Sequence, residues 1–148
     1  DEKSNILSFH SLAAEKLEPA QLCHMANREV NDAFAGLNLN KERLVGIGIS
    51  MPGIIDYQNG VVKFAAQTGW HNAAIKPMME EISGINCILD NDIKAAAYAE
   101  YIKGNATDSE IAVSLYFGNG LGSALIVNGQ IYRGVSNSAG ELGISLRI

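Results

Sequence analysis

Cysteine, proline, tryptophan and charged residues are all scarce in this chain of 148 residues. It contains two cysteines, three prolines and one tryptophan, and 18% of its residues are charged. Cys23 and Cys87 lie in apolar surroundings and form no C-x-x-C pair, which argues against a disulfide framework and against a cysteine metal site. Buried reduced thiols are the better interpretation, and they predict a cytoplasmic protein.

Other common features are also missing from the sequence. No apolar run approaches the roughly 20 residues that a membrane helix needs, and no signal peptide is recognisable. The net charge of −5 argues against a chain that grips the phosphate backbone of DNA by itself. The three histidines, His10, His24 and His71, share no spacing typical of metal ligands. We therefore expect no membrane partner and no direct contact with nucleic acid.

The chain does have enough apolar material for a core. Hydrophobic residues make up 47% of it, which excludes a disordered tail and fits one compact domain or two small lobes. The chain begins at Asp1 rather than at Met, and no sequence pattern marks an end at Ile148. We therefore expect a fragment of a longer protein.

Strand and helix patterns alternate over the first two thirds of the chain. In chain order the sequence predicts a strand at 4–12 with a weaker hairpin partner at 13–17, a helix at 20–34, a strand at 43–50, a helix at 72–83, a strand at 87–89 and a helix at 92–103. Asn72 is expected to cap the helix that begins there. This alternation predicts an α/β layer sheet with right-handed crossovers.

The pattern changes near residue 110, where strands follow one another. They are predicted at 111–117, 122–127 and 130–133, and Asn128-Gly129 between the last two is a strong hairpin signal. The polar stretch at 105–109 separates them from the first part. We therefore place a lobe boundary there, with one lobe at 1–106 and the beginning of a second at 107–148.

Two carboxylates and an amide stand where the strand at 87–89 gives way to a helix. Asp90, Asn91 and Asp92 all cap helices well, so capping is the plain interpretation. A cap needs only one such residue, however, and side chains at the carboxyl end of a sheet strand face the ligand crevice in α/β proteins. A carboxylate there can orient and deprotonate a hydroxyl, so we favour a functional role for Asp92.

Two further turns are candidates for ligand contact. GNGLGS at 118–123 brings bare backbone N–H groups together, as a phosphate requires, but a glycine-rich hairpin is the plainer interpretation. SAGELG at 138–143 carries Glu141, which is either an acceptor for ligand hydroxyls or a solvated acid. Trp70 is either a platform for a sugar ring or, more commonly, a core residue.

In this order and spacing, the motifs resemble the ROK family of sugar kinases and sugar-responsive transcriptional repressors. The matching stretches are GIGISMPGIID (46–56), NGVV (59–62), GW (69–70), DNDIKAAAYAE (90–100), FGNGLGSALIVNGQIYRG (117–134) and SAGELG (138–143). The resemblance implies the actin-like, ribonuclease-H-like ATPase fold in incomplete form. The lobe at 1–106 would lack its first strand, and apolar surface should therefore be exposed.

The resemblance implies a role for each matching residue. Asn91 and Asp92 correspond to a sugar-binding asparagine and to the catalytic aspartate that takes a proton from the phosphorylated hydroxyl. Glu141 corresponds to a sugar-binding glutamate, and Pro52 and Gly53 to positions near the cleft between the lobes. The second phosphate loop of the family corresponds to Gly118, Asn119, Gly120 and Gly122.

The chain also departs from the kinase pattern. The sequence DEKSN at 1–5 stands where the family's first phosphate loop carries glycines, and Asn119 stands where kinases usually carry threonine. Ile144 replaces a histidine that binds zinc in the family. Because isoleucine cannot coordinate a metal, we expect zinc to be altered or absent.

These features favour the sugar-sensing domain of a ROK-type transcriptional regulator, which binds a hexose or an N-acetylated amino sugar between its lobes. DNA would be contacted only through a domain outside this chain, and the family implies homo-oligomers. The alternative is an ATP-dependent hexose or N-acetylhexosamine kinase with Asp92 as the base and ATP and Mg²⁺ as cofactors. A degenerate member that only binds a partner or assembles is a third interpretation.

Overall fold

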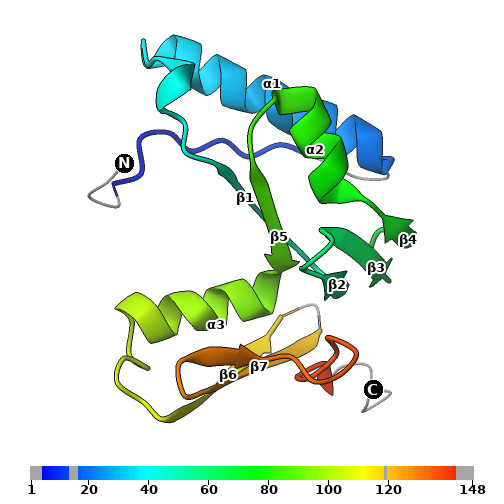
Figure 1. Ribbon diagram of the computed structural model, residues 1–148, viewed down its shortest axis with the longest axis vertical. Helices are drawn as coiled ribbons and strands as arrows, with labels where there is room; N and C mark the ends of the chain where they lie inside the picture. Colours follow the sequence, from blue (N-terminus) through cyan, green and yellow to red (C-terminus); the bar gives the residue numbers. More distant parts are fainter. Residues whose placement is uncertain (1–4, 14–16, 119, 143–148) are drawn as a thin grey trace.

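The structure is a computed structural model that describes residues 5–13, 17–118 and 120–142. Among these residues the helices are α1 (Pro19–Gly36), α2 (Ile75–Ser83) and α3 (Asp92–Lys103), with a short 3-10 helix at Lys41–Arg43. The strands are β1 (Ile47–Met51), β2 (Ile54–Asp56), β3 (Val61–Ala65), β4 (Trp70–Ala73), β5 (Cys87–Asn91), β6 (Ile111–Phe117), β7 (Leu121–Val127) and β8 (Gln130–Tyr132). In Figure 1, α1 and α2 lie at one end of the molecule and α3 with β6 and β7 at the other, joined by β5.

The first part is built on the parallel pair β1 and β5, with Ile47 beside Cys87 and Met51 beside Asn91. Helices α1 and α2 pack together over this pair (Figure 1). Local signals fix the ends of both helices. Pro19 opens α1 behind a capping box between Glu18 and Gln21, and Gly84 ends α2 in a left-handed conformation.

A small antiparallel sheet, β2–β3–β4, is inserted between β1 and α2. It contributes Ile55, Val62 and Trp70 to the first core. Trp70 is buried, and its Nε1 donates to the carbonyl of Leu17 at 3.2 Å. The core interpretation of this tryptophan is therefore confirmed. The full first core consists of Cys23, Met51, Ile55, Val62, Ala65, Trp70, Ala73, Ile75, Met79, Cys87 and Leu89.

The second part packs α3 against one face of the antiparallel sheet β6–β7–β8. Its buried centre consists of Ala97, Ala124 and Ile126, with Ile93 and Tyr101 against them. The predicted hairpin between β7 and β8 is confirmed, because Asn128 and Gly129 both have the positive φ angles of a type I′ turn. The bounds predicted for α3 and β6 match the observed ones.

Two apolar surfaces are exposed among the described residues, as expected. One is the face of β6 that points away from α3, which carries Ile111, Val113, Leu115 and Phe117. The other is a groove of about 1150 Å³ between residues 5–8, α1 and the edge of β1. Both cysteines are buried and form no disulfide, and burial raises the pKa of each thiol. None of the helices among the described residues is long and apolar enough to cross a membrane.

Three predictions need correction: one predicted strand is absent among the described residues, and one strand and one helix begin later than predicted. The described residues 5–13 form no strand, because the groove separates residues 5–8 from β1 and no other described strand pairs with them. The segment predicted to begin a strand at Arg43 instead ends a 3-10 helix, which Asn40 caps by accepting from the N–H of Glu42 at 2.9 Å. The strand therefore begins at Ile47.

The third error concerns Asn72. It lies in β4 with a positive φ angle, and the helix begins later, at Ile75, so Asn72 caps nothing. Strands β2, β3 and β4 are absent from the prediction, because strands of three to five residues carry too few residues for a clear alternation. The predicted hairpin partner at 13–17 falls mostly on residues 14–16, outside the described residues. The lobe boundary at 105–109 stays a prediction.

Candidate functional site

The candidate site lies where β1 and β5 end side by side. Because the two strands are parallel, the turn after Met51 and the start of α3 after Asn91 lie at the same edge. Pro52 and Gly53 form that turn, and both are half-buried. Four of the predicted site residues, Pro52, Gly53, Asn91 and Asp92, are thereby brought together.

Asn91 is the residue that caps α3. Its Oδ1 accepts a hydrogen bond from the backbone N–H of Lys94 at 3.0 Å, while its Nδ2 donates to the carbonyl of Gly53 at 3.0 Å. Only 4% of Asn91 is exposed. Gly53 has a φ of 105°, and a side chain there would collide with the backbone of Phe64, so glycine is required. The Asn91 side chain thus fastens the turn after β1 to the start of α3.

Asp90 has a different partner, Arg133, at the end of β8. The guanidinium donates to both carboxylate oxygens, at 2.8 Å from Nη1 and 2.6 Å from Nη2. Its central carbon also lies 3.8 Å from the centre of the Tyr57 ring. The hydrogen bonds to Asp90 raise the pKa of Arg133. We call Tyr57, Asp90 and Arg133 the clamp, because they join the β2–β3 turn, β5 and the residue after β8.

Asp92 differs from Asp90 and Asn91: among the described residues, its side chain makes no hydrogen bond to a residue distant in the chain. It is the first residue of α3, where the helix dipole favours a carboxylate. Its Oδ1 accepts from the adjacent N–H of Ile93 at 2.9 Å, and it is half-buried. Within the part of the chain that the structure describes, its second oxygen has no hydrogen-bond partner. That oxygen is suited to accept a hydrogen bond from a ligand hydroxyl.

Glu141 belongs to the same electrostatic neighbourhood as Asp92. Burial is the largest influence on its carboxyl group and raises its pKa, and the charge of Asp92 raises it further. The ammonium of Lys94 acts in the opposite direction, with its Nζ 3.6 Å from Glu141 Oε1. We call Asp92, Lys94 and Glu141 the charged cluster. Glu141 is therefore a half-buried acid and not a freely solvated one.

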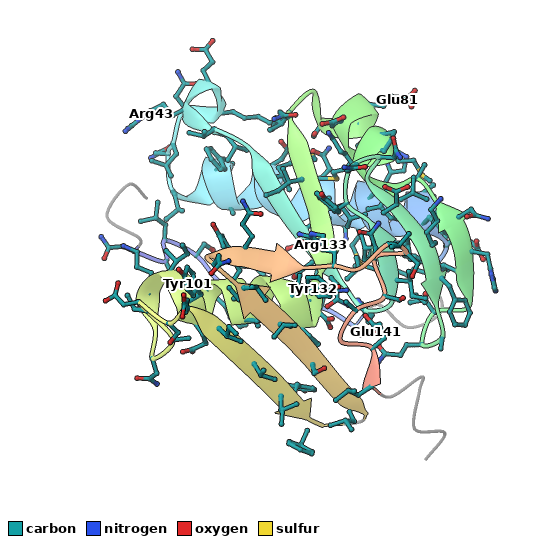
Figure 2. The ribbon with its side chains drawn as sticks, turned by 60° about the horizontal axis from the view of Figure 1, so that its bottom comes forward. Arg43, Glu81, Tyr101, Tyr132, Arg133 and Glu141 are labelled. Carbon is teal, nitrogen blue, oxygen red and sulfur yellow. The ribbon has the colours of Figure 1, made fainter. Side chains whose placement is uncertain are left out.

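The turn that carries Glu141 is attached firmly to β7. The backbone N–H and the hydroxyl of Ser123 both donate to the carbonyl of Gly140, at 3.2 and 2.6 Å. Gly140 has a φ of 88°, and a side chain there would collide with Ser123. Figure 2 shows this turn leading from Arg133 to Glu141. Gly140 is thus needed for the close contact that places Glu141.

The glycines of the predicted phosphate loop lie in or beside the β6–β7 hairpin. Gly118 and Gly120 lie in the tight hairpin between β6 and β7, where the N–H of Gly118 donates to the carbonyl of Gly120 at 3.0 Å. A side chain at Gly122 would collide with Ile93 on α3. Asn119 lies outside the described residues. Phosphate binding by this loop stays a prediction.

Two residues of the site, Lys94 and Arg133, are missing from the sequence-based prediction. Lys94 shares a helix face with Ala97 and Tyr101, which pack against β7. A lysine on an otherwise apolar helix face is a signal that could have revealed it. Arg133 carries no such signal, because its partner Asp90 lies 43 residues earlier in the chain.

The sequence predicts that no residue of this chain binds a metal and that zinc is altered or absent. No group of three histidine, cysteine, aspartate or glutamate side chains gathers among residues 5–13, 17–118 and 120–142. Ile144, on which the expectation about zinc depends, lies outside these ranges. The expectation of altered or absent zinc therefore stays a prediction.

Comparison with known proteins identifies the family. A sequence model described as the ROK family matches residues 1–146. The chain belongs to the ROK family. It has the α/β, actin-like ATPase fold of that family: a ROK family glucokinase from Streptomyces griseus, solved with glucose and AMPPNP, superposes with a TM-score of 0.78 and 26% identity, covering 97% of this chain and 44% of that one.

Curated ROK relatives divide between enzymes and regulators. A glucokinase of Halalkalibacterium halodurans is 34% identical over 110 residues, covering 74% of this chain and 33% of the relative. A xylose repressor of Bacillus subtilis is 33% identical over 100 residues, covering 68% of this chain and 26% of the relative. The chain thus spans a third or less of both relatives, and their similarity to it is nearly equal.

The clamp predicts strong coupling between Asp90 and Arg133. In a double-mutant cycle with Asp90→Asn and Arg133→Met, we expect a coupling of about 1–3 kcal/mol in the free energy of unfolding, because a bidentate ion pair is largely shielded from water. Urea unfolding of the natural full-length protein measures it. The pair Lys63 and Asp56 is the control: its lysine is exposed and makes a single contact of 3.5 Å with the carboxylate, so it should couple more weakly. Equal coupling energies in both pairs would contradict a special role of Asp90 and Arg133 in stability.

The raised pKa of Glu141 predicts a pH-dependent stability. The folded protein binds this proton more tightly than the unfolded chain does. The contribution of Glu141 to the free energy of unfolding is therefore fully present below its ordinary pKa of 4.5 and is lost as the pH rises through the folded value. Glu141→Gln should remove this slope in urea unfolding at a series of pH values, whereas the exposed Glu81→Gln should keep it. Parallel profiles for all three proteins would show that Glu141 is solvated.

Proposed function

We propose that this chain is part of the sugar-sensing region of a ROK transcriptional regulator. It would bind a hexose or an N-acetylated amino sugar through the carboxylates of Asp92 and Glu141. The observation that carries the proposal is the open oxygen of Asp92, at the start of α3, in the same charged cluster as the half-buried Glu141. Asn91 and Asp90, by contrast, are occupied by protein partners.

Half-buried carboxylates suit a sugar because each oxygen can accept strong hydrogen bonds from hydroxyl groups. The glucose present in the Streptomyces griseus relative supports a ligand of this class. In this chain Asn91 has both ends of its amide engaged by Lys94 and Gly53. Its proposed contribution to sugar binding is therefore to hold Asp92 and the Pro52-Gly53 turn in place. A direct contact between Asn91 and the sugar would be made without moving the amide from these two partners.

Sensing is preferred over phosphoryl transfer because of a hydrogen bond inside the predicted phosphate loop. In the second loop the Gly118 N–H is already engaged by Gly120, so this amide does not point to a phosphate. Because an engaged amide is less available to the phosphates of ATP, this contact supports sensing, and we assign no step to ATP or Mg²⁺.

In a regulator, the sugar would act by shifting the population of two arrangements of the protein. Helix α3 begins at the first part, where Asn91 holds Gly53, and packs against β7 in the second. A sugar held between Asp92 and Glu141 would favour one arrangement of the proposed lobes at 1–106 and 107–148. Transmission to DNA would require a domain outside this chain, and self-association into homo-oligomers is part of the same proposal.

A sugar kinase is the second candidate, and Asp92 is the observation that favours it. A carboxylate with an open oxygen can accept the proton of a sugar hydroxyl while the hydroxyl oxygen attacks a phosphate. A sensor needs this carboxylate only as a hydrogen-bond acceptor. The near-equal similarity to a glucokinase and a xylose repressor is compatible with either candidate.

Sugar binding without turnover is the expected result for the natural full-length protein. Calorimetry with a panel of hexoses and N-acetylated amino sugars should find saturable binding of one sugar, and MgATP should release no ADP with any of them. Asp92→Asn should weaken that binding about 10–100-fold, because a hydrogen bond to a charged group contributes about 1.5–3 kcal/mol. Asp32→Asn, on the exposed side of α1, is the matched control and should bind as the wild type does.

The same samples separate the two candidates. ADP release with one sugar, abolished by Asp92→Asn and kept by Asp32→Asn, would contradict the sensor and establish the kinase. Absence of both turnover and sugar binding would contradict both, and would favour a degenerate member that only binds a partner or assembles.

A further inference from the structure

Lys94 is a charged side chain in the interior of the molecule to which no role has yet been given. Its exposed fraction is 2%, and it lies in the first turn of α3 on the face that packs toward β7. A buried ammonium is costly unless it is paired and hydrogen-bonded. Its presence therefore requires partners that hold it.

The partners of Lys94 all lie in the candidate site. Its Nζ donates to the carbonyl of Asn137 at 2.8 Å and lies 3.6 Å from Glu141 Oε1. Its backbone N–H donates to the Asn91 side chain at 3.0 Å. One residue therefore links the cap of α3 to two points of the turn that carries Glu141.

The charges around Lys94 explain why an ammonium is needed there. Asp92 and Glu141 repel each other, and burial of Glu141 adds to the cost of its ionised form. Lys94 counters part of both effects from inside the protein, on a side that solvent does not reach. Its contact with the Asn137 carbonyl in addition holds the middle of the turn.

We propose that Lys94 is a positioning residue, whose buried ammonium holds the Glu141 carboxylate and its turn in the geometry that receives a sugar hydroxyl. The proposal rests on the function proposed above, because it assigns Glu141 to the sugar. Lys94 itself does not touch the ligand. Its effect is to keep Glu141 ionised, so that this carboxylate acts as an acceptor, and to fix the direction in which it points.

The test compares Lys94→Met and Lys94→Gln with Lys103→Met, all in the natural full-length protein. Met removes the charge at nearly constant length, and Gln keeps a donor for the Asn137 carbonyl without the charge. Lys103 is exposed at the end of the same helix and is the matched control. Two quantities are measured: the pKa of the Glu141 carboxyl by ¹³C NMR, and the dissociation constant of the sugar that binds the wild type.

We expect the pKa of Glu141 to rise in both Lys94 variants and to stay unchanged in Lys103→Met. Sugar binding should weaken about 10–100-fold in Lys94→Met, the loss typical of one charged hydrogen bond. Adding Lys94→Met to Glu141→Gln should cost little further affinity, because the two changes remove the same contribution. If Lys94→Met does not fold, Lys94→Gln gives the same two readouts.

An unchanged Glu141 pKa in the folded Lys94 variants would overturn the proposal. So would a full additional loss of affinity on top of Glu141→Gln, since Lys94 would then act on something other than Glu141. Failure of the wild type to bind any sugar would sink the proposed function and with it the assignment of Glu141 to a sugar. The Glu141 pKa would still show in that case whether the ammonium controls the carboxylate, so the two failures are distinguishable.

Discussion

The two-sided hydrogen bonding of Asn91 is the constraint on which the rest of the site depends. One end of its amide caps α3 through the N–H of Lys94, and the other holds the carbonyl of Gly53 in the turn after β1. Because both bonds are directional and the side chain is buried, the helix can leave β5 in only one direction relative to that turn. This direction places Asp92 and Lys94 opposite the turn of Glu141.

A polar junction between two apolar cores follows from this arrangement. The first core ends at Leu89 and the second begins at Ile93, so the chain crosses between them at residues 90–92. Hydrophobic contacts carry no preferred direction and would leave the angle between the cores poorly defined. The bonds of Asp90 to Arg133 and of Asn91 to Gly53 supply that direction. Asp92 lies at the junction, and its second carboxylate oxygen is available to accept a hydrogen bond from a ligand.

Sequence patterns predicted well the elements whose signals are local. The alanine-rich run of α3 and the Asn128-Gly129 hairpin are of this kind, because caps and turns depend on neighbouring residues. The N-terminal strand was predicted wrongly, since a strand forms only where a partner strand lies beside it. In the site, the sequence could not show which of Asp90, Asn91 and Asp92 caps α3. Their roles depend on Gly53 and Arg133, each about 40 residues distant in the chain.

The most direct test of the account is a crystal structure of the natural full-length protein with the sugar that it binds most tightly. We predict that sugar hydroxyls lie within hydrogen-bond distance of Asp92 and Glu141, that Asn91 still holds Gly53, and that Lys94 lies behind Glu141 without touching the sugar. A sugar bound elsewhere, with Asp92 and Glu141 both turned toward protein groups, would contradict the account.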